Sequence, residues 1–112
     1  MSVQVDVDTV YEPDALVRCG EPVHDDTVKI SDPVIVVEVI SPSSRGQDTG
    51  AKLQDYFRLP SVRHYLVVNA RKRSAVHHCR DAAGLIQTRI VRTGTLDLSP
   101  PGITLALDDL FA

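Results

Sequence analysis

Residues 33–40 read PVIVVEVI, a run of β-branched side chains that a single acidic residue, Glu38, interrupts. Such a run is typical of a central strand that is covered on both faces of its sheet. A buried carboxylate costs several kcal/mol unless a cation meets it. Glu38 therefore either points to solvent from an edge strand or is buried beside a metal ion or a lysine. Its neighbours are apolar on both sides of the pleat, which favours the second interpretation.

The residues that follow this strand predict a β-α-β unit. Residues 47–59 carry a helical pattern in which Leu53 and Phe57 lie on one apolar stripe, and Pro60 ends the helix. Residues 65–68 form a second β-branched segment, which we expect to pair with the first strand after the helical crossover.

Shorter elements are expected on either side of this unit. Valine alternates with polar residues from position 3 to 7, positions 15–19 are extended, and the polar stretch 20–32 indicates a loop. Residues 75–79 and 85–91 flank a plausible hairpin turn and are expected to be outer strands. The tail predicts a loop followed by a short apolar closing segment. Together these elements predict a single α/β domain over residues 1–112.

The composition is that of a globular protein. The chain has 112 residues, of which 43% are hydrophobic and 24% charged, a balance that disordered and membrane proteins do not show. The longest apolar run, residues 34–40, is far shorter than a membrane-spanning helix, and the N-terminus has no export leader. A cytoplasmic protein with no membrane contact is expected. Cys19 and Cys79 are too few for a disulfide framework and are interpreted as free thiols.

The overall charge opposes sequence-independent binding to nucleic acid. The formal net charge is -3 and the pI is near 5.7. Two features reduce this objection, since Arg71, Lys72 and Arg73 form a local basic cluster and bound metal ions can supply positive charge at a phosphate.

Asp14 and Lys52 are the other candidates for chemistry. Asp14 follows Pro13, where a carboxylate can cap a turn as easily as bind an ion. Lys52 lies four residues after Asp48, so a surface ion pair on the helix is one interpretation. The other is that the short connection before the helix brings Lys52 near the end of the Glu38 strand, where α/β sheets place ligands. Two carboxylates and one ammonium would then converge.

Such a group of side chains suits phosphodiester hydrolysis. Two carboxylates can hold one or two Mg²⁺ ions, and a nearby lysine can orient water or stabilise the transition state. A zinc site is not expected from the histidines. His77 and His78 are adjacent and face opposite sides of a strand, while His24 and His64 stand in loop-like contexts.

Three segments together resemble the Uma family of endonucleases, within the PD-(D/E)xK nuclease superfamily. They are EPD at 12–14, PVIVVEVISPSSRGQDTGAKLQDY at 33–56 and VRHYLVVN at 62–69, and the likeness runs from about Tyr11 to the C-terminal LALDDLF. The resemblance implies a restriction endonuclease-like mixed β-sheet flanked by helices and a Mg²⁺- or Mn²⁺-dependent activity on DNA. It implies these roles: Asp14 and Glu38 as catalytic metal ligands, Lys52 as the catalytic lysine, and Asp48 and Tyr56 as supporting residues.

The chain departs from the superfamily pattern at two places. The pattern puts a lysine two residues after Glu38, where this chain has Ile40; in the Uma family the lysine lies on the following helix, at the place of Lys52. Family members usually begin with a further helical and strand region, so the domain is expected to be shortened at its N-terminus. A shortened sheet has an exposed edge, which a second subunit can cover, and a homodimer is expected.

Two hypotheses from different classes follow. The first is a Mg²⁺-dependent endonuclease that cleaves DNA with Asp14, Glu38 and Lys52. The second is a shortened, catalytically inactive relative that acts as a homodimeric or partner-binding module. Changing Glu38 to glutamine separates them, because only the first predicts loss of cleavage with retained folding.

Overall fold

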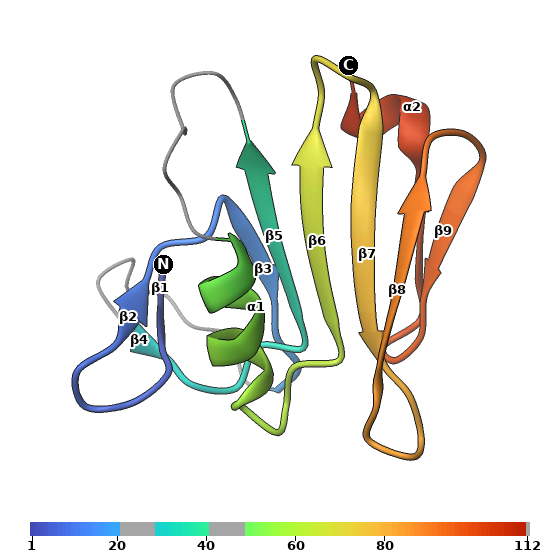
Figure 1. Cartoon of the computed structure of the whole chain (residues 1–112). Helices are drawn as coiled ribbons and strands as arrows, with labels where there is room; N and C mark the ends of the chain where they lie inside the picture. The colour runs from blue at the N-terminus through green and yellow to red at the C-terminus, as the bar shows by residue number, and fades with distance from the viewer. Residues whose placement is uncertain (21–28, 41–48, 112) are drawn as a thin grey trace.

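The computed structural model describes residues 1–20, 29–40 and 49–111. Its centre is a five-stranded sheet in the order β3-β5-β6-β7-β8 (Figure 1). The strands are β3 (Ala15–Val17), β5 (Ile35–Ile40), β6 (His64–Asn69), β7 (Ser74–Arg80) and β8 (Ile86–Val91). Because β5 lies between β3 and β6, the prediction that residues 33–40 form an interior strand is confirmed.

The predicted β-α-β unit is present. β5 and β6 are parallel, with Glu38 opposite Val67, and α1 (Thr49–Phe57) connects them across one face of the sheet (Figure 1). The other strand pairs of this sheet are antiparallel, so the sheet is mixed, as expected. β7 and β8 form the predicted hairpin, in which the Asp81 carboxylate accepts the backbone N–H groups of Ala83 and Leu85.

Two smaller sheets complete the described structure. β1 (Ser2–Gln4) pairs with β2 (Val10–Tyr11) and β4 (Lys29–Ile30), and β9 (Thr95–Leu98) pairs with β10 (Ile103–Ala106).

The two ends of the chain differ from the sequence-based expectations. The first strand is shorter than predicted, since it ends at Gln4 and Val7 is 88% exposed. β4 lies inside the expected loop 20–32, of which residues 21–28 lie outside the described parts. The tail from residue 99 begins with the expected loop, a turn at residues 99–102, and its closing segment forms β10 and a short helix; the strand β9 before this loop was not predicted.

The expectation of a sheet flanked by helices needs correction. In the described parts of the chain, the helices are α1, with nine residues, and α2 (Leu107–Leu110), with four. The face opposite α1 is covered by α2 and the β9–β10 hairpin. In β9, the buried Leu96 and Leu98 alternate with exposed residues, the pattern of a strand with one covered face. Neither of these helices has the length and apolar character needed to cross a membrane.

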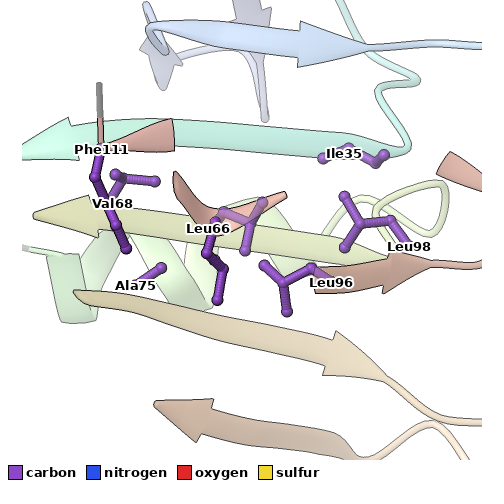
Figure 2. Packing of buried hydrophobic residues seen from close by; sticks show 8 residues of the cluster. Ile35, Leu66, Val68, Ala75, Leu96, Leu98 and Phe111 are labelled. Carbon is purple, nitrogen blue, oxygen red and sulfur yellow. The ribbon is translucent and has the colours of Figure 1, made fainter. Parts of the chain in front are cut away.

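Each face of the central sheet has its own apolar cluster. The cluster under β9, β10 and α2 (Figure 2) consists of Ile35, Leu66, Val68, Ala75, Leu96, Leu98, Leu107 and Phe111. The cluster under α1 consists of Val3, Val36, Tyr56, Leu59, Val62, Tyr65 and Val67. Successive residues of a strand point to opposite faces, so β5 and β6 contribute to both clusters and Glu38 lies on the α1 face.

Candidate active site

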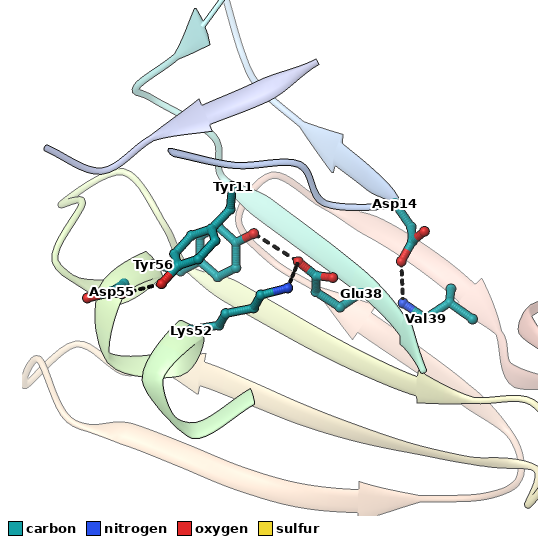
Figure 3. Close-up of polar contacts among 7 residues, drawn as sticks. All are labelled: Tyr11, Asp14, Glu38, Val39, Lys52, Asp55 and Tyr56. Atoms are coloured by element: carbon teal, nitrogen blue, oxygen red, sulfur yellow. Dashed lines mark hydrogen bonds and ion pairs between the residues drawn. The ribbon is translucent and has the colours of Figure 1, made fainter. Parts of the chain in front are cut away.

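Glu38 is buried beneath α1, with only 2% of its surface exposed. Its Oε1 atom accepts a hydrogen bond of 2.9 Å from the Tyr56 hydroxyl and lies 3.4 Å from the Lys52 ammonium (Figure 3). The predicted burial of Glu38 beside a lysine is therefore confirmed. Both donors meet the same oxygen, so Oε2 receives neither of these two bonds.

The helix α1 delivers both donors from one side. Lys52 and Tyr56 are four residues apart, so their side chains lie one above the other on the face that packs on β5 and β6. The Lys52 side chain is only 15% exposed, so its pairing with Glu38 is not a surface ion pair. Asp48, the expected supporting residue one turn before Lys52, lies outside the described residues.

Two buried phenols surround the carboxylate. Burial and the negative charge of Glu38 raise the pKa of the Tyr56 hydroxyl, so it remains protonated and donates its hydrogen bond at any physiological pH. Burial and Glu38 also raise the pKa of the Tyr65 hydroxyl. The Tyr65 oxygen is buried and has no hydrogen-bond partner within the described parts of the chain. The Tyr65 hydroxyl can therefore donate a hydrogen bond to a water molecule or to another group that enters the site.

Asp14 lies on the neighbouring strand, directly before β3. Ala15 pairs with Val37, so one step further along this antiparallel pair Asp14 stands opposite Glu38. The Asp14 carboxylate is exposed and accepts the backbone N–H of Val39 at 2.6 Å (Figure 3). Among the described residues, no hydrogen bond or ion pair joins Asp14 to Glu38 or Lys52. Glu38, Lys52 and Tyr56 are thus brought into contact, and Asp14 lies beside them without contact.

The position where the superfamily has its strand lysine is occupied by an apolar residue. Ile40 packs against the cluster under α1, the face on which Glu38 also lies. A lysine at position 40 would approach the same face from the strand. Lys52 brings its ammonium to this face from the helix instead, and this is consistent with the substitution inferred from the family resemblance.

Two further polar residues belong to the site, and the sequence analysis missed both. The Tyr11 hydroxyl donates a hydrogen bond to Asp55 of α1, and the Lys52 ammonium lies 5.4 Å from the centre of the Tyr11 ring. Asp55 is three residues after Lys52, a spacing that places both residues on the same face of a helix. Nothing in the local sequence, however, indicates that Asp55 contacts Tyr11. The contact joins β2 to α1 and confines the Lys52 side chain.

The donor set fits a hard divalent cation. Asp14 and Glu38 offer carboxylate oxygens on adjacent strands, the kind of ligand that Mg²⁺ and Mn²⁺ prefer. Formally, Asp14, Glu38 and Lys52 sum to one negative charge, so the group can accept a cation.

The basic cluster predicted from the sequence lies at the same end of the sheet. Arg71, Lys72 and Arg73 are exposed in the turn between β6 and β7. β5 and β6 are parallel, and their C-terminal ends point to the end where this turn lies (Figure 1). The Arg73 guanidinium is 3.2 Å from Asp108, in an exposed ion pair. Positive side chains are therefore available near the C-terminal end of the Glu38 strand.

Two known proteins resemble this chain, one in its fold and the other in its sequence. The crystal structure titled as a putative nuclease belonging to DUF820, from Anabaena variabilis, superposes with a TM-score of 0.60 at 10% sequence identity. The match covers 74% of this chain and 46% of that one, and it shows the likeness of the fold. An uncharacterized protein of Synechocystis sp. is 29% identical over 100 residues, which are 88% of this chain and 53% of the relative. The chain thus spans about half the length of these relatives.

The family match covers most of the chain. Uma2, a family described as "Putative restriction endonuclease", matches residues 1–108. This range contains both candidate carboxylates, the helix α1 and, apart from Phe111, both apolar clusters. The predicted membership is confirmed, and the chain belongs to the Uma2 family.

Proposed function

We propose that this chain is a Mg²⁺-dependent endonuclease domain that hydrolyses phosphodiester bonds in DNA, with Asp14, Glu38 and Lys52 as its catalytic residues. The observation that carries the proposal is the buried carboxylate of Glu38, which Lys52 and Tyr56 hold on one oxygen beside Asp14. Family membership and the fold of the Anabaena variabilis protein support a nuclease. Mn²⁺ offers the same ligand preferences and is expected to substitute for Mg²⁺.

Charge explains why a metal ion would be required. The three catalytic side chains sum to one negative charge, which repels a phosphodiester. Asp14 and Glu38 would hold the ion, and when bound it supplies positive charge at the scissile phosphate and at the leaving oxygen. With one divalent ion the site becomes singly positive, which matches the single negative charge of a phosphodiester.

The protein side chains have distinct roles in this proposal. Lys52 donates to Glu38 and, near a substrate, orients water or stabilises negative charge on the phosphoryl oxygens. Tyr56 stays protonated and fixes the position of the Glu38 carboxylate. Burial under α1 lowers the local dielectric constant around Lys52 and so strengthens the attraction between its ammonium and a phosphate.

DNA is proposed as the substrate because of the position of the basic turn. Arg71 and Lys72 are exposed near the C-terminal end of the Glu38 strand, where they can contact phosphates beside the scissile bond. They supply local positive charge on a chain whose formal net charge is -3.

We propose in addition that the domain functions as a homodimer. β8 is one of the two edge strands of the five-stranded sheet within the described residues, the other being β3, and it exposes Ile86 at 37% and Ile90 at 69%. An exposed strand edge with apolar side chains is a template for pairing with another strand. A second copy of the chain would cover this edge.

The test is cleavage of supercoiled plasmid DNA by the purified chain with Mg²⁺, with Mn²⁺ and with EDTA. We expect nicking that depends on the metal and falls about 100-fold or more in Asp14→Asn, Glu38→Gln and Lys52→Met, as for loss of residues that act in the transition state. Exposed residues of the same type provide matched controls: Glu12→Gln and Lys29→Met keep the catalytic group intact.

Circular dichroism shows whether each variant is folded, and calorimetry measures whether the chain binds Mg²⁺ or Mn²⁺. Together with the cleavage assay they separate the two hypotheses. A folded Glu38→Gln chain without cleavage supports the nuclease. A wild-type chain that neither cleaves DNA with Mg²⁺ or Mn²⁺ nor binds either ion would exclude it. In that case Glu38 and Lys52 would be a structural ion pair of a non-catalytic module.

A further inference from the structure

A second group of ligand-type side chains lies on the sheet face opposite Glu38. His64 begins β6, and His77 and Cys79 belong to β7. His64 pairs with Cys79 and Leu66 pairs with His77, so all these side chains are on the face that packs against β9, β10 and α2. His64 and His77 are 1% and 0% exposed, and Cys79 is half-buried. The proposed nuclease mechanism uses none of them.

The pair of histidines that meets is not the adjacent pair. The expectation that His77 and His78 face opposite sides is confirmed, since His77 stacks on His64 and His78 stacks on Tyr65. The loop-like context assigned to His64 was wrong, because this residue belongs to β6. An ion shared by His64 and His77 is therefore compatible with His77 and His78 facing opposite sides of β7.

The ligand atoms are at distances that suit a small ion. The two histidine nitrogens and the Cys79 sulfur all lie within 4.8 Å of one another, and His64 Nδ1 is 2.9 Å from His77 Nε2. In a tetrahedral zinc site, Zn–N and Zn–S distances place neighbouring ligand atoms about 3.3 to 3.7 Å apart. The observed separations bracket this range, so small ring and side-chain rotations are sufficient.

The hydrogen bonds of His64 leave the required lone pair facing the cluster. His64 Nε2 lies 2.8 Å from the Pro100 carbonyl oxygen, which can only accept, so the proton of this ring is on Nε2. His64 Nδ1 then carries a lone pair. A metal-binding histidine commonly donates its other N–H to a backbone carbonyl in this way, which fixes the ring.

The second ring is also neutral. Burial, followed by the proximity of His64, lowers the pKa of His77 to about 4, and burial lowers the pKa of His64. His77 Nε2 donates to His64 Nδ1, and its Nδ1 lies 3.4 Å from the guanidinium of Arg89. Both imidazoles are therefore neutral at neutral pH, each with one ring nitrogen protonated, and the neutral ring is the form that binds metals.

We propose that His64, His77 and Cys79 form a Zn²⁺ site that ties β6 to β7 and is separate from the Asp14–Glu38 site. Nitrogen and thiolate ligands select Zn²⁺ over Mg²⁺, whereas the carboxylates on the other face suit Mg²⁺ and Mn²⁺. Three protein ligands leave the fourth position to water.

Two protons move when the ion binds. The Cys79 thiol loses its proton to solvent and binds as the thiolate. The His77 proton moves from Nε2 to Nδ1, so that Nε2 can bind the ion; the Arg89 guanidinium, which can only donate, must then move away from Nδ1–H. Binding thus releases about one proton per ion at pH 7, and the affinity falls as the pH is lowered.

The test uses the full chain after removal of metals with EDTA, with Co²⁺ and Zn²⁺ as probes. We expect a one-to-one Co²⁺ complex with a thiolate-to-cobalt absorption band, which Zn²⁺ displaces, and a rise in melting temperature with Zn²⁺. Cys79→Ser should abolish the band and weaken Zn²⁺ binding at least about 100-fold, more than the loss of a group that only orients a ligand.

Three controls keep the outcome specific. Cys19→Ser removes the other cysteine, which is exposed, and His78→Gln changes the histidine on the opposite face. Glu38→Gln alters the proposed Mg²⁺ site. All three should retain the cobalt band, so failure of this proposal is distinguishable from failure of the nuclease.

A wild-type chain without the band, or a band that survives in Cys79→Ser, would overturn the zinc site. A band lost in Cys19→Ser would also overturn it, since another thiolate would then be the ligand. The cobalt spectra of the wild-type chain and of Cys19→Ser together decide the question even where Cys79→Ser fails to fold.

Discussion

Glu38 depends on two donors that approach the same oxygen. Tyr56 donates one hydrogen bond, and Lys52 supplies the balancing charge at 3.4 Å. A carboxylate that is 2% exposed needs such partners, because water cannot replace them without opening the helix contact. The residue is thus part of the stability of the fold as well as of the proposed chemistry.

Replacing Lys52 with methionine should lower the free energy of unfolding by about 3 kcal/mol, because a buried carboxylate then loses its counter-charge. Urea denaturation at pH 7 measures the change. Lys72→Met, at an exposed turn position, should change it by less than about 0.5 kcal/mol. Equal unfolding midpoints for the two variants would show that the Glu38–Lys52 pair contributes no net stability.

His77 predicts a loss of stability in mild acid. Its pKa is about 4 in the folded chain against 6.5 for an unperturbed histidine. The unfolded state therefore binds more protons between these values, and the free energy of unfolding falls as the pH drops from 6.5 towards 4. The expected loss is on the order of 3 kcal/mol for His77, and His64 acts in the same direction.

Urea denaturation in EDTA at several pH values measures this loss. In His77→Gln the slope between pH 6.5 and 4 should flatten. Hydrogen-bonded carboxylates contribute at lower pH, because the pKa values of Asp6, Asp32 and Asp81 are lowered from 3.8. An unchanged slope in the variant would assign the acid sensitivity to other groups.

At the scale of elements, β7 holds the C-terminal end of α1 in place. The Arg80 guanidinium donates to the carbonyl oxygens of Phe57 and Leu59, at 2.6 and 3.2 Å, and packs over the Phe57 ring. The last carbonyls of a helix have no partner within the helix, so a cation there satisfies them. This contact helps to fix the helix that carries Lys52 and Tyr56.

Arg80→Met should therefore lower the free energy of unfolding by about 2 kcal/mol, as expected for hydrogen bonds from a charged donor. Arg73→Met is the matched control, since the Arg73 pair with Asp108 is exposed and should contribute less than about 1 kcal/mol. Thermal melts of both variants measure the difference. Similar losses would mean that the α1 contact is no stronger than a surface pair.

The turn between β6 and β7 predicts how DNA binding depends on salt. Arg71→Gln and Lys72→Gln each remove one exposed positive charge near the proposed site. Each should reduce the slope of log K against log salt by about 1 and weaken binding to all sequences alike. Fluorescence anisotropy with a duplex, in Ca²⁺ to prevent cleavage, measures the slope. Slopes equal to that of the wild type would place the DNA elsewhere.

At the scale of the whole molecule, the exposed edge of the five-stranded sheet predicts a dimer. Ile90→Lys puts a charge at a position that is 69% exposed on β8 and should give a monomer with unchanged fold. Val7→Lys changes an 88% exposed residue far along the chain from β8 and should leave the dimer intact. Sedimentation equilibrium measures the masses. A wild-type chain that is monomeric at every concentration would refute the dimer.

Local patterns were sufficient for the main elements. The β-branched run 33–40, the apolar stripe of Leu53 and Phe57 and the hairpin turn before β8 each depend on neighbours within a few residues. Those parts of the prediction are confirmed. The ends were predicted less well: Val7 continues the alternation but lies outside β1, and β4 and the β9–β10 hairpin form because other segments cover them.

The sequence by itself determined that a carboxylate would stand within an apolar strand followed by a helix with a lysine, because charge, burial and helical spacing are local properties. Only the tertiary structure decided that Lys52 and Tyr56 meet one oxygen of Glu38, that Asp14 bonds to the Val39 backbone, and that His64 meets His77. These contacts depend on strand register and on how the helix lies across the sheet. Both result from packing between segments far apart in the chain, which local periodicity does not encode.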